Sequence, residues 1–141
     1  MCDKICFEEK EGAFLSRIII VDDYKPFCIM WADFLASNYP GKAIIQIFTN
    51  PFSAMPHLDS DISLLLIDYE MPQIDGKKFL EYAASKGVKR SRMIVTSAKD
   101  INELHKIFPP GSCLAVINKE DPAQNEAFIM ILDSFMKKLE C

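Results

Sequence analysis

The sequence predicts a single-domain α/β protein with a doubly wound, five-stranded parallel sheet and five helices. Two observations support this prediction. Five short apolar runs, rich in Ile, Leu and Val, alternate along the chain with segments of helical periodicity, and this alternation is typical of parallel sheets covered by helices on both faces. The length of 141 residues also fits one domain of ordinary size.

Each expected strand is a short apolar run that ends at polar or turn-forming residues. The expected strands cover residues 17–21, 43–48, 63–67, 93–96 and 113–117, and the expected helices cover about 26–38, 52–58, 77–86, 101–108 and 122–139. Pro26 and Pro122 suit the first turn of a helix. Asp121 is expected to cap the last helix, and Gly87 to end the third.

Two helices carry more apolar side chains than one buried face requires. In the first helix, the residues expected to face the core are Phe27, Met30, Trp31, Phe34 and Leu35, which leaves Cys28, Ile29 and Ala32 outward. In the last helix, residues 127–132 are apolar on all sides. Exposed apolar patches often mark protein contacts, so both helices are candidate partner surfaces.

Composition limits the classes of function. We expect an N-terminal extension over residues 1–16 and one domain over 17–141. The net charge of −4 and the pI of about 5.2 give no basic footprint for nucleic acid. No apolar run has membrane-spanning length and the N-terminal segment lacks a signal-peptide pattern, so a cytoplasmic protein is expected. The five cysteines form no metal-type pairing, which indicates free thiols.

Polar residues stand at the ends of four expected strands. The first strand ends at Asp22 and Asp23, the third at Asp68, the fourth at Thr96 and Ser97, and the fifth at Lys119. Parallel strands share their carboxyl-terminal edge, so these side chains should converge. Three clustered carboxylates repel one another, so they need a cation or must take up protons, and oxygen ligands of this kind suit Mg²⁺.

An acidic cluster beside a hydroxyl and a lysine fits the chemistry of phosphoryl transfer to a carboxylate. Asp68 would be the nucleophile that forms an aspartyl phosphate. Magnesium and Lys119 would neutralise the phosphoryl oxygens during in-line transfer.

Four segments carry a resemblance to a known family. They are Ile-Ile-Val-Asp-Asp at 19–23, Leu-Leu-Ile-Asp-Tyr-Glu-Met-Pro-Gln-Ile-Asp-Gly at 65–76, Ile-Val-Thr-Ser-Ala at 94–98 and Ile-Asn-Lys at 117–119. In this order and spacing they resemble the receiver domain of two-component response regulators, the CheY-like fold. The resemblance covers about residues 17–139.

The resemblance implies a role for each residue of the metal site. Asp68 would accept the phosphoryl group and bind magnesium. Asp23 would bind the ion directly and Asp22 mainly through water, and the main-chain carbonyl of Glu70 would be a further ligand.

The resemblance also implies a signalling role rather than an enzymatic one. Thr96 would hydrogen-bond the phosphoryl group and Lys119 would pair with it. The donor would be a phosphohistidine on a sensor histidine kinase or a histidine phosphotransfer protein. The protein would catalyse only its own phosphorylation and dephosphorylation, and would act on a downstream partner or homodimerise through its fourth and fifth helices.

Three positions leave the function open. Glu120 follows Lys119 where the family usually has a cis proline, and Val116 stands where the family has a Tyr or Phe that swings inward on activation. These departures keep a degenerate receiver, binding partners without phosphorylation, as an alternative. A phosphatase or phosphotransferase using an aspartyl phosphate is another alternative. The Glu70 side chain is either a tuner of dephosphorylation or a solvated loop charge.

Overall fold

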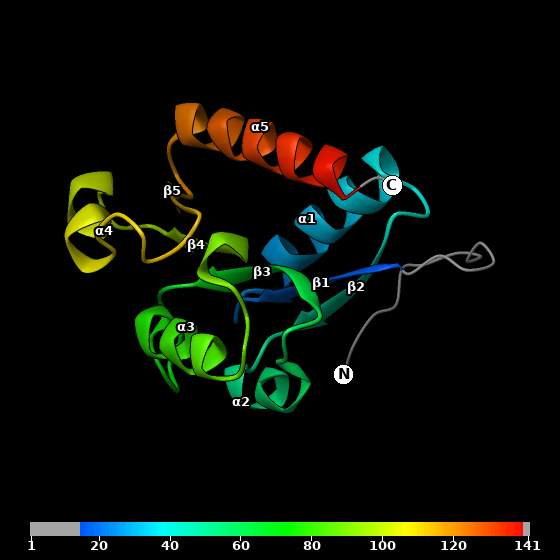
Figure 1. Ribbon diagram of the computed structural model, residues 1–141. Coiled ribbons are helices and arrows are strands. Elements are labelled where there is room, and N and C mark those ends of the chain that lie inside the picture. The colour runs from blue at the N-terminus through cyan, green and yellow to red at the C-terminus, as the bar shows by residue number, and fades with distance from the viewer. Residues whose placement is uncertain (1–14, 140–141) are drawn as a thin grey trace.

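A five-stranded parallel sheet with the strand order β2-β1-β3-β4-β5 forms the centre of the computed structural model, which describes residues 15–139 (Figure 1). The strands are β1 (Ser16–Val21), β2 (Ala43–Phe48), β3 (Ile62–Asp68), β4 (Met93–Ser97) and β5 (Ala115–Asn118). The helices are α1 (Lys25–Asn38), α2 (Pro51–Ala54), α3 (Gly76–Ser85), α4 (Ile101–Ile107) and α5 (Pro122–Lys138), with 3₁₀ turns at Met55–His57 and Arg90–Arg92. The predicted fold class is confirmed, with small shifts at the ends of elements.

Helices cover both faces of the sheet. Helices α1 and α5 lie on one face, and α2, α3 and α4 lie on the other (Figure 1). Side chains of a strand alternate between faces, so Ile18 and Ile20 pack under α1 and α5 while Ile19 and Val21 pack on the opposite side. All seven residues of β3 are buried, as expected for a central parallel strand that is apolar along its length.

The connection order changes direction between β1 and β3. From β1 the chain crosses outward to β2, then returns past β1 to β3 and continues to β4 and β5. The carboxyl ends of β1 and β3 therefore lie side by side at the point where the sheet reverses its winding. Open α/β sheets bind ligands in the crevice at such a switch point.

Helix starts follow their sequence signals. The Asp121 carboxylate accepts a hydrogen bond from the Ala123 amide at 3.0 Å and Pro122 occupies the first turn, as predicted. Asp75 and Asp100 cap α3 and α4 in the same manner. Each cap satisfies an amide that would otherwise lack an intrahelical partner. Gly87 has a φ of 101°, the left-handed conformation expected after a helix.

The expected buried face of α1 is partly wrong. Trp31 and Leu35 are buried as predicted, but Met30 is 52% exposed. Cys28 and Ala32, expected to face outward, are buried. Residues 28, 31, 32 and 35 follow the i, i+3, i+4, i+7 spacing of one helix face. The helix is apolar on several faces, so its pattern permitted more than one inward stripe.

Exposed apolar side chains remain on both candidate partner helices. On α1, Ile29 is exposed as predicted, next to Met30. On α5, Ile129 and Met130 are exposed, Met130 to 71%, while Phe128 beneath them is fully buried. None of the helices within residues 15–139 is long and apolar enough to cross a membrane.

Some sequence predictions concern residues that the structure does not describe. The expected extension over 1–16 lies outside the described residues up to position 14, whereas Ser16 already belongs to β1. Cys28 and Cys113 are free thiols, as predicted. Cys2, Cys6 and Cys141 fall outside the described residues.

Candidate functional site

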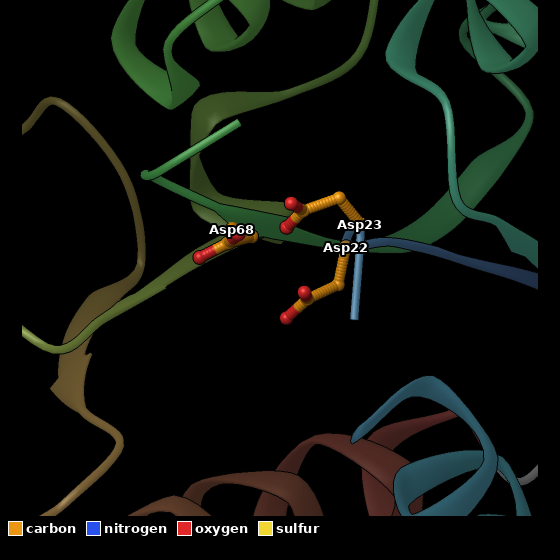
Figure 2. A group of neighbouring side chains, drawn as sticks. All are labelled: Asp22, Asp23 and Asp68. Carbon is orange, nitrogen blue, oxygen red and sulfur yellow. The ribbon is translucent and has the colours of Figure 1, made fainter. Parts of the chain in front are cut away.

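The strand register brings the predicted acidic residues together. Val21 pairs with Ile67, so the residues that follow them, Asp22 and Asp68, leave neighbouring strand ends side by side. Asp23 follows Asp22 in the β1–α1 loop. The three carboxylates each offer an oxygen within 4.8 Å of the others (Figure 2). Asp22 and Asp68 are 1% and 2% exposed, whereas Asp23 is exposed.

This donor set fits a hard divalent cation. Magnesium prefers oxygen ligands, binds through one or two protein carboxylates and keeps several waters. Two buried carboxylates with an exposed third offer that combination, because Asp23 is open to solvent. The Glu70 carbonyl, predicted as a further ligand, belongs to the loop directly after β3.

The loop after Asp68 is held close to the strand by Gly76. The Gly76 amide donates to the Tyr69 carbonyl at 2.8 Å. A Cβ built on Gly76 would lie 2.7 Å from the Asp68 carbonyl oxygen and 2.7 Å from the Tyr69 Cα. Such distances are far inside van der Waals contact, so glycine is needed here for close approach of two backbone segments.

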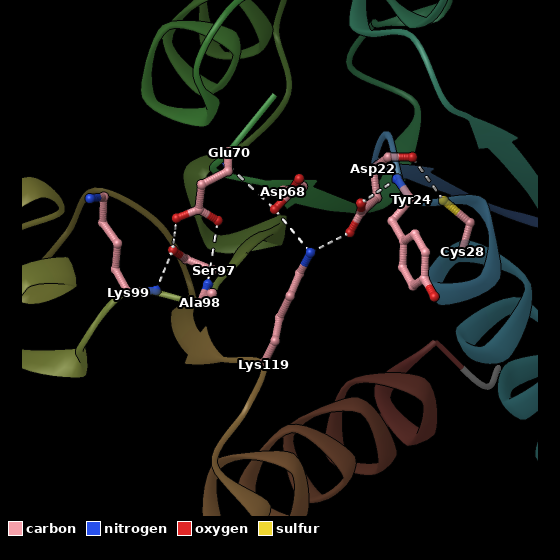
Figure 3. Close-up of polar contacts among 9 residues, drawn as sticks. All are labelled: Asp22, Tyr24, Cys28, Asp68, Glu70, Ser97, Ala98, Lys99 and Lys119. Carbon is pink, nitrogen blue, oxygen red and sulfur yellow. Dashed lines mark hydrogen bonds and ion pairs between the residues drawn. The ribbon is translucent and has the colours of Figure 1, made fainter. Parts of the chain in front are cut away.

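Lys119 joins the two buried acids. Its ammonium lies 2.8 Å from Asp22 Oδ2 and 3.0 Å from Asp68 Oδ1 (Figure 3). The other oxygen of Asp22 accepts a hydrogen bond from the Tyr24 amide at 2.9 Å. The ammonium also lies 4.4 Å from the centre of the Phe27 ring, a favourable cation–π position. One ammonium therefore pairs with both buried acids.

Burial and mutual charge shift the pKa values of Asp22, Asp68 and Lys119. Desolvation, together with the negative charge of Asp22, raises the pKa of Asp68 to about 7 although Lys119 opposes the shift. Desolvation also raises the pKa of Asp22, against the hydrogen bonds from Lys119 and Tyr24. Desolvation disfavours the Lys119 ammonium, but the two carboxylates outweigh it and the pKa of Lys119 is raised. A metal ion would favour the charged carboxylates.

Two hydroxyl side chains lie at the end of β4. Thr96 is the register partner of Asp68 and is buried beside it. Ser97 follows on the opposite face of the strand, donates its hydroxyl hydrogen to Glu70 Oε2 at 2.5 Å and accepts from the Lys99 amide at 3.0 Å. The other Glu70 oxygen, Oε1, accepts from the Ala98 amide at 3.3 Å (Figure 3). The Glu70 carboxylate thus connects the β3–α3 loop to the β4–α4 loop.

The end of β5 is fixed by backbone and amide contacts. The Lys119 amide donates to the Ser97 carbonyl at 2.8 Å, and the Asn118 side chain donates to the Lys99 carbonyl at 2.9 Å. The Asn118 side-chain oxygen accepts from the Glu120 amide. Within the described residues every peptide bond is trans, the Lys119–Glu120 bond included. The ammonium reaches both acids with this loop geometry.

Comparison of the sequence with known families and proteins finds no relative. No protein-family model and no curated protein matches the chain. Solved structures do match. A CheY-like receiver domain from Methanospirillum hungatei JF-1 has a TM-score of 0.68 at 20% identity, over 90% of this chain and 98% of that one. A response regulator from Colwellia psychrerythraea has a TM-score of 0.68 at 20% identity, over 89% and 99% of the two chains.

A third similar structure is the BeF3-activated DrrB receiver domain, with a TM-score of 0.70 at 12% identity, over 88% of this chain and 99% of that one. The chain has the receiver-domain fold. The predicted resemblance to receiver domains is therefore confirmed at the level of the fold.

The departures from the usual receiver pattern have a structural context. Val116 is buried against the layer of α2, α3 and α4 and pairs with Val95 on β4. Val116 fills part of the core, and its short branched side chain cannot rotate between core and surface as a long aromatic side chain can.

Sequence reasoning missed three contacts at the site. The link from Glu70 to Ser97 joins positions 27 residues apart, and the Phe27 ring beside Lys119 was expected only to fill the core. Cys28 donates its thiol hydrogen to the Asp22 carbonyl at 3.3 Å, and desolvation raises its pKa to about 12. Helical spacing placed Phe27 on the inner side of α1, but spacing alone gives no sign of a lysine 92 positions later.

The raised pKa of Asp68 predicts how stability changes with pH in the absence of a divalent cation. The unfolded carboxyl loses its proton near pH 3.8, whereas the folded one keeps it up to about pH 7. The native state binds more protons in this window, so the stability linked to Asp68 is fully present below pH 3.8 and is lost as the pH rises through 7. Asp68→Asn should therefore be more stable than wild type above pH 7, by about 1–3 kcal/mol.

Urea unfolding with a chelator present, followed across this pH range, measures the difference. The advantage of Asp68→Asn should shrink toward pH 3.8. Asp33→Asn, at an exposed position on α1, is the control and should change stability by less than about 0.5 kcal/mol. A stability difference for Asp68→Asn that does not vary with pH would contradict the raised pKa.

Proposed function

We propose that this chain is a phosphorylatable receiver, which accepts a phosphoryl group on Asp68 with the help of Mg²⁺ and thereby switches a protein-interaction surface. One observation carries the proposal. The Lys119 ammonium lies between the buried carboxylates of Asp22 and Asp68, with the Asp23 carboxylate beside them. Structural ion pairs seldom bury two acids against one lysine, because desolvating each charge is costly.

The residues of the cluster have separate roles in the proposed transfer. Asp22, Asp23, Asp68 and the Glu70 carbonyl would hold the magnesium ion, which neutralises phosphoryl oxygens. An Asp68 oxygen attacks phosphorus while the phosphorus–nitrogen bond of a phosphohistidine breaks. The electron pair of that bond stays on the imidazole nitrogen. Lys119 then exchanges part of its pairing with Asp68 for the new phosphoryl oxygens.

The hydroxyl at the end of β4 would hydrogen-bond the phosphoryl group. The sequence assigned this role to Thr96. The Ser97 hydroxyl is a second candidate, because it already donates to a carboxylate at the same edge of the sheet. Ser97 shares its face of β4 with Val95, the register partner of Val116. A movement of the Ser97 side chain would therefore shift the side chains that pack under α4.

Partners would be recruited through the exposed apolar residues. The phosphodonor, a sensor histidine kinase or a histidine phosphotransfer protein, would dock on α1, where Ile29 and Met30 are exposed in the half of the helix that follows the acidic β1–α1 loop. A downstream protein or a second copy would bind α4 and α5, where Met130 is the most exposed large apolar side chain. Such a pathway would operate in the cytoplasm.

The arrangement gives less support to the enzymatic alternative. Phosphatases of the haloacid dehalogenase type, which use an aspartyl phosphate, place a second Asp two residues after the nucleophile. Glu70 holds that position, but its carboxylate binds Ser97 and Ala98. The degenerate receiver differs from the proposed receiver in that Asp68 would not be phosphorylated.

Incubation with Mg²⁺ and acetyl phosphate should add one phosphoryl group to the wild-type protein and none to Asp68→Asn, because Asp68 provides the attacking oxygen. Intact-mass spectrometry measures the modification. Removing Mg²⁺ should abolish it. Absence of modification, together with absence of any magnesium-dependent fluoroberyllate binding, would establish the degenerate receiver instead.

The two hydroxyls of β4 can be compared directly through Thr96→Val and Ser97→Ala. We expect Thr96→Val to weaken fluoroberyllate binding more, by about two- to tenfold, which is the value of a modest hydrogen bond. Thr96 is the register partner of Asp68, whereas Ser97 points to the opposite face of β4. Titration followed by NMR measures both affinities. A larger loss in Ser97→Ala would assign the role to Ser97.

Self-association through α5 is tested by sedimentation with and without fluoroberyllate. If a second copy covers this helix in the phosphorylated state, wild type should become a dimer on binding, and Met130→Glu should stay monomeric because the dimer would bury an unpaired charge. Ser134→Glu, at an exposed position of the same helix, controls for added charge. A monomer under all conditions would exclude the homodimer.

A further inference from the structure

The Lys119 ammonium has a neutral neighbour besides its two acids. Its nitrogen lies 2.8 Å from Asp22 Oδ2 and 3.0 Å from Asp68 Oδ1 (Figure 3). The same nitrogen lies over the Phe27 ring, 4.4 Å from the ring centre, which is well inside the reach of a cation–π attraction. The Lys119 side chain is only 19% exposed, so water screens this attraction less than it would at an open surface.

The position of the Phe27 ring is fixed by neighbours outside the acidic cluster. Pro26, with its restricted backbone, precedes it in the first turn of α1, and the Phe27 amide donates to the Tyr24 carbonyl at 3.1 Å. One turn later, Trp31 packs edge-on against the ring with 6.2 Å between the ring centres. Trp31 is buried and packs in turn against Phe128 of α5 at 4.3 Å. Packing between α1 and α5 therefore sets where the ring lies.

We propose that Phe27 is a positioning residue for phosphoryl binding, whose ring holds the Lys119 ammonium at the acidic edge while the ammonium exchanges Asp68 for phosphoryl oxygens. This inference rests on the proposed phosphorylation of Asp68. Phe27 acts through Lys119 and not on the reacting atoms.

The ring differs from the two acids in what phosphorylation does to it. Once an Asp68 oxygen is bonded to phosphorus, that side chain no longer carries a carboxylate charge for the ammonium. Asp22 would also ligate magnesium, and a carboxylate that ligates one cation attracts a second less strongly. An aromatic hydrocarbon ring takes no part in either change. The attraction between Phe27 and Lys119 therefore persists when both acids weaken their hold.

An ordered lysine also lowers the entropy lost when a phosphoryl group binds. A lysine side chain has many rotamers, and holding it in one of them is unfavourable. Because the Phe27 ring already restricts the Lys119 head group, the phosphoryl group does not have to order it. Weakening the attraction of the ring should therefore weaken phosphoryl binding, although every group that contacts the phosphoryl oxygens is kept.

The test changes the charge distribution of the ring at nearly constant shape. Phenylalanine carrying one, two or three fluorine atoms replaces Phe27 at this position alone, since each fluorine draws electron density from the ring face and reduces its attraction for a cation. Fluoroberyllate affinity in Mg²⁺, measured by NMR titration, should fall with each fluorine, by about two- to tenfold in total. Phe27→Leu should bind at least as weakly as the trifluorinated protein. An affinity that does not fall with fluorination would overturn the positioning role.

Phe34 provides the matched control. Its ring packs edge-on against Trp31 at 5.5 Å, so it shares the indole contact of Phe27. Trifluorinated phenylalanine at position 34 should leave fluoroberyllate affinity at the wild-type value. A loss as large as that at position 27 would assign the effect to aromatic packing and overturn the proposal.

The NMR signal of Lys119 shows directly whether the ammonium stays on the ring. Its ε-methylene protons should be shifted upfield by the ring current of Phe27, both in free wild type and with fluoroberyllate bound. Phe27→Leu should remove the shift. Loss of the shift when wild type binds fluoroberyllate would show that the lysine leaves the ring, which would overturn the proposal.

The same titration distinguishes failure of the positioning role from failure of the proposed function. If wild type shows no binding that depends on both Mg²⁺ and Asp68, the phosphoryl-acceptor proposal fails and the role of Phe27 fails with it. If wild type binds but fluorination at position 27 has no effect, the positioning role alone fails. Circular dichroism confirms that each variant is folded, which is expected because Phe27 and Phe34 are only half-buried.

Discussion

The organisation of this protein depends on the burial of two carboxylates against one lysine at the point where the sheet reverses direction. Asp22 and Asp68 have little contact with solvent, and Lys119 reaches both. Such an arrangement is stable only while a cation or protons balance the charge, as the raised pKa of Asp68 indicates. The strand order, the tight turn at Gly76 and the position of the β5 end all maintain this one electrostatic constraint.

The edge of the sheet has two sides with different chemistry. Asp22, Asp68 and Lys119 lie on the side of α1 and α5, where charge is concentrated. Ser97 and the Glu70 carboxylate lie toward α3 and α4, where hydrogen bonds connect two loops. The fold therefore keeps the ion-paired residues and the hydrogen bonds between loops on opposite faces of β3 and β4.

The sequence predicted the sheet and the acidic cluster because both follow from local signals. Apolar runs mark the strands, and the parallel arrangement brings the ends of those strands together. The inward face of α1 was misassigned because apolar residues occur on several of its faces, and Cys28 packs where Met30 was expected. The link between Glu70 and Ser97 could not be predicted, since it depends on how two loops lie in space.

The row of aromatic rings beside Lys119 has an optical consequence. The Phe27 ring lies under the ammonium, Trp31 packs edge-on against Phe27 at 6.2 Å, and Phe128 packs against Trp31 at 4.3 Å. Trp31 is the single tryptophan of the chain. Its fluorescence therefore comes from one buried indole, separated from the charged centre by one ring. The protein has a built-in spectroscopic probe of its own acidic edge, and no label needs to be attached.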